Sequence, residues 1–121
     1  MDSKVIDIVK RIAEEEGWNV TIDGDTLNFQ RYSPAGQDFS FDIEIKDEDT
    51  LDDVRKKILD YYYAFDVSYE AYLWLDNTGH GKNGAPNDML DVYNDMKWCD
   101  IEICLLHKEF LDYEHKEIYK D

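Results

Sequence analysis

Cysteine, proline and basic residues are scarce in this sequence, and each scarcity excludes a class of protein. Two cysteines and two prolines occur in 121 residues, and no apolar run approaches the ~20 residues that span a membrane. Only 13 Lys and Arg stand against 29 Asp and Glu, so the formal net charge is -16. Such a surface does not bind nucleic acid or anionic lipid by neutralising phosphates. Its electrostatic field favours a basic protein surface as partner instead.

The two cysteines, Cys99 and Cys104, lie five positions apart in a helical pattern. Their side chains therefore point in different directions around the helix, and we expect no disulfide and no zinc site between them. Buried thiols that act as small apolar side chains are the expectation. The sequence predicts no metal and no cofactor. Its N-terminus has neither an apolar signal core nor a small-residue cleavage site, which indicates a cytoplasmic protein.

Aromatic residues are abundant at 14%, which argues against a disordered acidic chain, and the length fits one domain over residues 1–121. Apolar residues at helical spacing predict a helix over residues 3–16, capped by Asp2 or Ser3 and ended by Gly17. Alternating patterns then predict an antiparallel three-stranded meander with one apolar face. Its apolar positions are Trp18, Val20, Ile22, Leu27, Phe29, Phe39, Phe41, Ile43 and Ile45. The predicted turns are Asp23-Gly24 and residues 33–36.

Helical patterns fill the rest of the chain. Thr50 and Asp53 have the spacing of a capping box before a helix over residues 50–65, and a short helix is predicted over 68–75. From residue 87 the apolar residues repeat every 3.5 positions, as in a coiled coil. This C-terminal seam consists of Met89, Val92, Met96, Cys99, Ile103, Leu106, Phe110 and Tyr113. The predicted fold is α+β: a helix, the meander, then three to four helices packed on one face of the sheet.

The C-terminal pattern is long for a domain of this size. An unbroken helix would measure ~50 Å, whereas a compact globule of this length has a radius of gyration of ~14 Å. Two interpretations stay open. The helix breaks near Asp100, or it projects and pairs with a partner through the C-terminal seam.

The acidic residues are concentrated after the sheet, because residues 47–76 and 87–121 each carry a net charge of -6. Carboxylates on successive helical turns lie ~5.4 Å apart, and alternate residues of a strand lie ~6.6 Å apart. Such rows can imitate the regular anions of a nucleic-acid backbone. On the last helix Asp88, Asp91, Asp95, Glu102 and Glu109 follow the edge of the C-terminal seam. The predicted partner-binding carboxylates are Asp42, Glu44, Asp52, Asp53, Asp88, Asp91 and Asp95.

The segment from Asp76 to Pro86 is the one glycine-rich loop. Its amides and Lys82 offer an anion site before a helix, but the glycine spacing is not that of a phosphate-binding loop. Three interpretations remain: a tight connector between helices, a secondary partner contact made by Trp74, His80 and Lys82, or an enzyme site in which His80 and Lys82 act on a phosphate.

Two segments carry a resemblance: YSPAGQDF (residues 32–39) and YLWLDNTGHGKNGAP (residues 72–86). They resemble small acidic proteins of phages and mobile elements of Gram-positive bacteria. The order of a helix, a meander and acidic helices is also similar to some anti-CRISPR proteins, a group that, like the antirestriction proteins, includes DNA mimics. The resemblance implies a non-enzymatic inhibitor, in the bacterial cytoplasm, that blocks the nucleic-acid-binding surface of a host defence nuclease. The alternative is a protein-binding module or homodimer built on the C-terminal seam, with acidity serving solubility.

Overall fold

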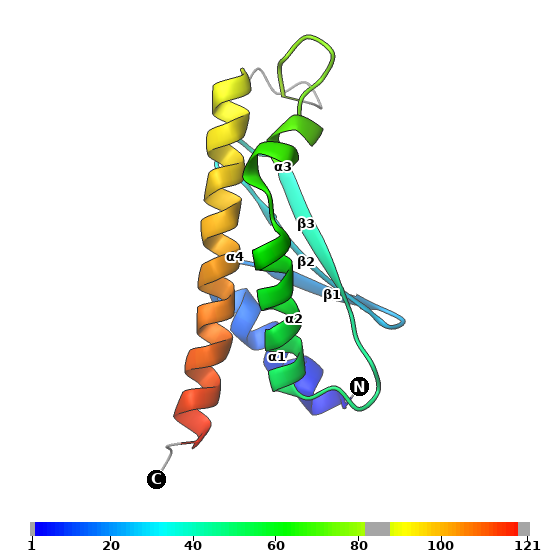
Figure 1. Cartoon of the computed structure of the whole chain (residues 1–121). Coiled ribbons are helices and arrows are strands. Elements are labelled where there is room, and N and C mark those ends of the chain that lie inside the picture. Colours follow the sequence, from blue (N-terminus) through cyan, green and yellow to red (C-terminus); the bar gives the residue numbers. More distant parts are fainter. Residues whose placement is uncertain (1, 82–87, 119–121) are drawn as a thin grey trace.

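A computed structural model describes residues 2–81 and 88–118 of the chain. The predicted α+β class is confirmed: a helix, a three-stranded antiparallel sheet, and three further helices that pack together (Figure 1). In chain order the elements are α1 (Ser3–Glu15), β1 (Asn19–Asp23), β2 (Thr26–Tyr32), β3 (Asp38–Glu44), α2 (Leu51–Ala64), α3 (Val67–Leu73) and α4 (Met89–Ile118).

The helix ends follow the capping residues that the sequence predicts. The Asp2 carboxylate accepts a hydrogen bond from the Lys4 N–H at the start of α1. After this helix Gly17 has φ +90°, and a Cβ there would lie 3.1 Å from the Arg31 guanidinium, so any other residue would be strained and would have to displace Arg31. Thr50 and Asp53 form both hydrogen bonds of the capping box at α2. The last short helix, α3, spans 67–73 rather than the predicted 68–75.

The sheet has the strand order β1-β2-β3, with one apolar and one polar face. Asp23 pairs with Thr26, so the tight turn lies one residue later than predicted, at residues 24–25. The inward residues that are buried in the core are Val20, Leu27, Phe29, Phe39, Phe41, Ile43 and Ile45. Ile22 was predicted on the apolar face but is exposed, because it lies near the end of an edge strand, where less of the core covers it.

Helix α4 is continuous over 30 residues, about 45 Å at 1.5 Å per residue. Of the two open interpretations, the one with a break near Asp100 is therefore wrong, and the continuous helix is observed. No proline or glycine occurs between Met89 and Ile118 to interrupt the helix. The molecule accommodates this length by being elongated: α2 and α3 lie end to end along α4, so two shorter helices cover one long one (Figure 1).

The C-terminal seam faces the interior of the chain itself. Its six central residues, Val92, Met96, Cys99, Ile103, Leu106 and Phe110, are completely buried. Because these side chains pack inside one chain, they are not open to a second copy. Cys99 behaves as predicted, and burial raises the pKa of its thiol to about 12. Cys104 is exposed, contrary to prediction, since it lies on the opposite side of α4; both cysteines are free.

Candidate protein-binding surface

The polar face of the sheet carries charged and polar side chains at regular strand spacing. The residues that point away from the helices form what we call the outer sheet face: Asn19, Thr21, Asp23, Thr26, Asn28, Gln30, Tyr32, Asp38, Ser40, Asp42 and Glu44. The alternation of strand side chains places them all on one side, because the other side is packed against the helices.

Side-chain amides hold the carboxylates of the outer sheet face in place. Asn28 Nδ2 donates to Asp42 Oδ1 at 2.8 Å, directly across the β2–β3 pair. Gln30 Nε2 donates to Asp38 Oδ1 at 2.8 Å, and Asn19 Nδ2 donates to Gln30 Oε1 at 2.9 Å. These cross-strand bonds fix the direction of two anions while leaving their outward oxygens free for a partner.

The outer sheet face carries four carboxylates, Asp23, Asp38, Asp42 and Glu44, and no lysine or arginine. Within residues 2–81 and 88–118 none of the four forms an ion pair. Alternate strand residues place Asp42 and Glu44 ~6.6 Å apart. The two carboxylates predicted on the sheet are therefore accessible and unneutralised, and the fold adds Asp38 and Asp23 beside them.

Asp95 is not part of a surface row, which corrects the prediction for this residue. It is only 5% exposed. Its carboxylate accepts hydrogen bonds from the Ser33 hydroxyl and, at 3.1 Å, from the Ala35 N–H. It thus joins the turn between β2 and β3 to α4, and its oxygens are occupied by neutral donors.

The rest of the predicted row on α4 is interrupted as well. The Asp88 carboxylate accepts the Asp91 N–H at 2.9 Å and so caps the start of the helix, as acids at helix N-termini commonly do. Glu102 binds Arg31, with 3.0 Å between Oε2 and Nη1. Asp91 remains exposed. A continuous line of free carboxylates along α4 therefore does not exist.

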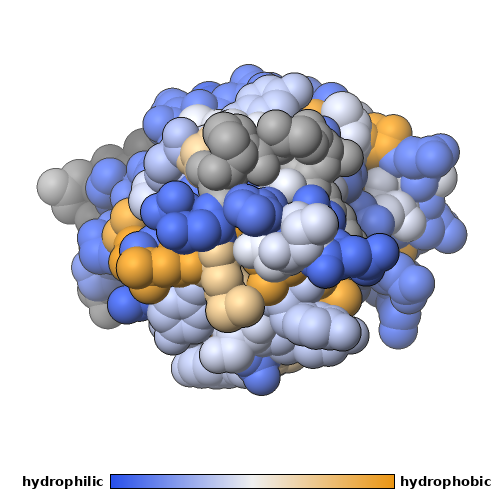
Figure 2. All heavy atoms as spheres, turned by 90° about the horizontal axis from the view of Figure 1, so that it is seen from above, coloured by the Kyte–Doolittle hydropathy of each residue, from blue (hydrophilic) through white to orange (hydrophobic). Residues whose placement is uncertain are grey.

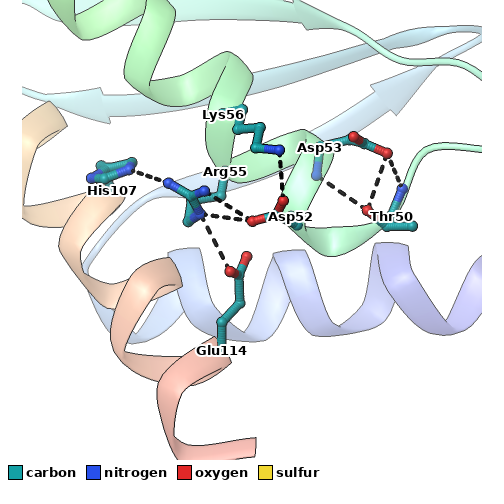
Figure 3. Close-up of polar contacts among 7 residues, drawn as sticks. All are labelled: Thr50, Asp52, Asp53, Arg55, Lys56, His107 and Glu114. Atoms are coloured by element: carbon teal, nitrogen blue, oxygen red, sulfur yellow. Dashed lines mark hydrogen bonds and ion pairs between the residues drawn. The ribbon is translucent and has the colours of Figure 1, made fainter. Parts of the chain in front are cut away.

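Asp52 and Asp53 have partners at the start of α2 (Figure 3). Asp53 completes the capping box with Thr50. Asp52 lies 2.9 Å from Arg55 and 3.0 Å from Lys56, and hydrogen bonds from these two cations, first Lys56 and then Arg55, lower its pKa to about 2. Both carboxylates are therefore already bound to groups of the chain itself at the start of α2.

Arg55 also joins α2 to the C-terminal half of α4 (Figure 3). Its Nε lies 3.3 Å from Glu114 Oε2, and its Nη1 donates to His107 Nε2 at 3.0 Å. His107 must be neutral to accept this bond. Burial and then the Arg55 charge lower the pKa of His107 below its ordinary 6.5.

Because of this lowered pKa, we expect His107 to make stability depend on pH. The unfolded chain takes up a proton near pH 6.5, whereas the folded chain resists it, so this contribution is lost as pH falls below that value. Glutamine keeps an acceptor for Arg55 but does not titrate. Urea unfolding should show that the stability advantage of the wild type over His107→Gln is larger at about pH 7.5 than at about pH 5. The same advantage at both values would contradict this account.

The end of the molecule where α3 and the start of α4 meet carries exposed apolar side chains. Figure 2 looks onto this end and shows hydrophobic side chains at the surface among hydrophilic ones. Tyr72 is 69% exposed and lines a shallow pocket with the exposed Leu73 and Met89, and Leu90 is exposed as well. This apolar end surface offers aromatic and aliphatic anchors of the kind that stabilise protein interfaces.

The predicted secondary contact is placed only in part. Trp74 packs against the core and is partly buried. His80 is exposed, and its Nδ1 lies 2.9 Å from the Thr78 hydroxyl. Lys82 lies outside the described residues. The Asp76 carboxylate accepts the N–H groups of Thr78 and His80 at 2.8 and 3.1 Å, so this part of the loop is organised by its own acid.

In the described ranges, no group of three or more His, Cys, Asp or Glu side chains could hold a metal ion. Every helix among the described residues is too short or too polar to span a bilayer.

Sequence reasoning missed Asp38 and Asp23 as members of the surface, although both flank predicted strands. Their place depends on strand register, since Asp38 pairs with Tyr32 and Asp23 with Thr26. Gln30 was the available signal for Asp38 in the sequence. It lies two residues before the end of β2, and its side-chain amide can reach an acid on the next strand.

Comparison of the chain with protein-family models, with curated proteins and with solved structures finds no match.

Proposed function

We propose that this protein is a non-enzymatic inhibitor that presents its outer sheet face to the nucleic-acid-binding surface of a defence nuclease, of the anti-CRISPR or antirestriction kind. The single observation that carries the proposal is the composition of that face. It holds four carboxylates without one compensating cation, on a chain of net charge -16.

The geometry of these carboxylates supports competition with nucleic acid. Lysine and arginine side chains that line a nucleic-acid channel are spaced to meet phosphates, and each nucleic-acid strand carries one phosphate per ~3.4 Å of helix axis. Asp42 and Glu44, ~6.6 Å apart along one β-strand, have about the axial spacing of two phosphate steps. Amide hydrogen bonds to Asp38 and Asp42 keep both anions oriented before binding.

The net charge also sets how the proposed complex forms. A strongly negative protein approaches a positive surface faster than uncharged proteins meet, and added salt slows this approach. We therefore expect fast association at low salt, and weaker binding as salt is raised. A tight complex whose affinity is the same at low and high salt would contradict electrostatic recognition.

The test compares two neutralised variants of equal net charge. Asp38→Asn, Asp42→Asn and Glu44→Gln together remove three charges from the outer sheet face while keeping side-chain size. Asp7→Asn, Glu14→Gln and Glu15→Gln remove three exposed charges from α1. Purified nucleases of the restriction and CRISPR classes are assayed for DNA binding and cleavage with each protein.

We expect the wild type and the α1 variant to inhibit a nuclease alike. The sheet variant should require about tenfold more protein, since each exposed ion pair contributes roughly 0.2–1 kcal/mol. Duplex DNA should compete with the inhibitor for the nuclease. Equal losses in both variants, or wild-type protein that leaves DNA binding by every nuclease unchanged, would overturn the proposal.

A further inference from the structure

Strand β3 forms an open edge of the sheet. It spans seven residues, Asp38–Glu44, and pairs only with β2. In Figure 1 it runs along the side of the molecule, with no strand beyond it. An edge of this length presents main-chain N–H and C=O groups that another extended segment can bind.

The register shows which main-chain groups of β3 face outward. Asp23 and Thr26 flank a two-residue turn, and the residues at such a turn hydrogen-bond to each other through their main chains. The main-chain groups of Thr26 therefore face β1. Those of Leu27, and of every second residue after it in β2, face β3. Leu27 pairs with Ile43. The outward groups of β3 therefore belong to Asp38, Ser40, Asp42 and Glu44.

One hydrogen bond already reaches these outward main-chain groups of β3. Lys57 Nζ donates to the Glu44 carbonyl at 2.8 Å, which agrees with the outward direction derived from the register. In the described part of the chain no other hydrogen bond reaches the outward main-chain groups of β3. Three successive outward-facing residues, Asp38, Ser40 and Asp42, thus keep unpaired donors and acceptors at an exposed edge.

A groove of about 270 Å³ lies between this edge and α2. Its walls include Asp42 and Glu44 of β3, and Lys57, Asp60 and Tyr61 of α2. The Tyr61 ring stacks on Phe41 at 4.3 Å between centroids, so it forms a firm apolar wall. A strand added to β3 would direct alternate side chains toward this groove, which has an aromatic wall and a rim of three carboxylates and Lys57.

The charges of β3 disfavour a second copy of the chain as the occupant. Antiparallel pairing of two β3 strands about Phe41 places Asp38 opposite Glu44 and Ser40 opposite Asp42. Pairing about Ser40 places Asp38 opposite Asp42. Like charges directly across a strand pair are destabilising. A segment with lysine or arginine at the same alternate positions would instead neutralise all three carboxylates.

We propose that β3 accepts an added β-strand from the partner, and that this strand carries lysine or arginine at alternate positions. The identity of the partner as a basic protein rests on the proposed function, whereas the open edge and its charges do not. Main-chain hydrogen bonds would supply affinity, and the carboxylates of β3 would select the basic sequence.

The probe is a seven-residue peptide with lysine at its first, third and seventh positions, threonine at the fifth and valine elsewhere. In antiparallel pairing its lysines lie opposite Glu44, Asp42 and Asp38. A second peptide carries N-methyl groups on the amides that would face β3, so it keeps the charge but cannot donate main-chain hydrogen bonds to β3, and the methyl groups hinder close pairing. Binding is measured by fluorescence anisotropy, and protection of the β3 amides by hydrogen exchange.

On the protein, Ser40→Pro removes an outward N–H without changing charge. Proline is tolerated in an edge strand when its missing N–H faces solvent, and Ser40→Thr is the matched control. We expect about tenfold or greater loss of affinity for the methylated peptide, which lacks several main-chain donors, and a smaller but measurable loss for Ser40→Pro, which lacks one. Ser40→Thr should bind like the wild type, and the amides of Ser40 and Asp42 should gain protection.

Equal affinity of the two peptides for the wild type would overturn strand addition, and this comparison does not depend on the folding of any variant. If the sheet variant nevertheless lost nuclease inhibition, the proposed function would stand and only its binding mode would fall. Conversely, methylation-sensitive peptide binding without inhibition of any nuclease would support strand addition while the proposed function failed.

Discussion

Truncation of Phe110 to alanine is expected to lower the free energy of unfolding by about 3–5 kcal/mol. The Phe110 ring is completely buried in the C-terminal seam. Its removal loses apolar burial and leaves a cavity that the surrounding helices fill only in part. Urea unfolding at equilibrium, followed by circular dichroism, measures the change.

The neighbouring residue supplies the control. Leu111 is 47% exposed on the same helix, and its truncation to alanine should cost less than about 1 kcal/mol, as surface substitutions do. If Phe110→Ala is unfolded without urea, Phe110→Leu gives a smaller loss of the same sign. Similar costs at the two neighbouring positions would show that α4 does not direct its seam inward as described.

Replacement of Arg31 by methionine should lower the free energy of unfolding by about 2–4 kcal/mol, because it removes one partner of a largely buried ion pair. The side chains of Arg31 and Glu102 are 19% and 17% exposed. The guanidinium carbon lies 4.6 Å from the Trp98 ring centroid and 5.5 Å from that of Trp18. Its Nη1 also donates to the Glu16 carbonyl at 2.9 Å.

A double-mutant cycle separates the ion pair from the packing. Glu102→Gln removes the charge that Arg31→Met leaves unpaired, so the double variant should be more stable than the sum of the two single losses indicates. Arg31→Lys keeps the charge but loses the planar stacking and the fork of donors, and it should fall between wild type and Arg31→Met. Strictly additive losses in the cycle would argue against a coupled pair.

Local patterns predicted much of the fold because they depend on near neighbours. The alternation from Phe39 to Ile45 predicts which residues of β3 are buried, and the capping box at Thr50 predicts the start of α2. Gly17 ends α1 because its left-handed backbone is a local requirement. On the surface, Asp42 and Glu44 were predicted correctly as exposed carboxylates for the same reason.

The remaining features depend on contacts between residues distant in sequence. The 3.5 period predicts the seam of α4, but the length of α4 depends on α2 and α3 lying end to end beside it. Asp95 and Glu102 stand beside the seam as Asp91 does, yet Ser33 and Arg31 from β2 and its turn bind the first two. Periodicity along one helix does not show what packs beside it, so the predicted row on α4 could not be tested from sequence.

The bond between Asp95 and the turn at Ser33 has a consequence for recognition. It ties the end of the β2–β3 hairpin to α4, while the cross-strand amides fix the carboxylates at the hairpin's surface. A partner that docks on the hairpin would therefore find it already ordered, and association would forfeit little conformational entropy. Loosening this tie by Asp95→Ala would leave every exposed charge in place, yet each encounter would then have to reorganise the hairpin before it became productive.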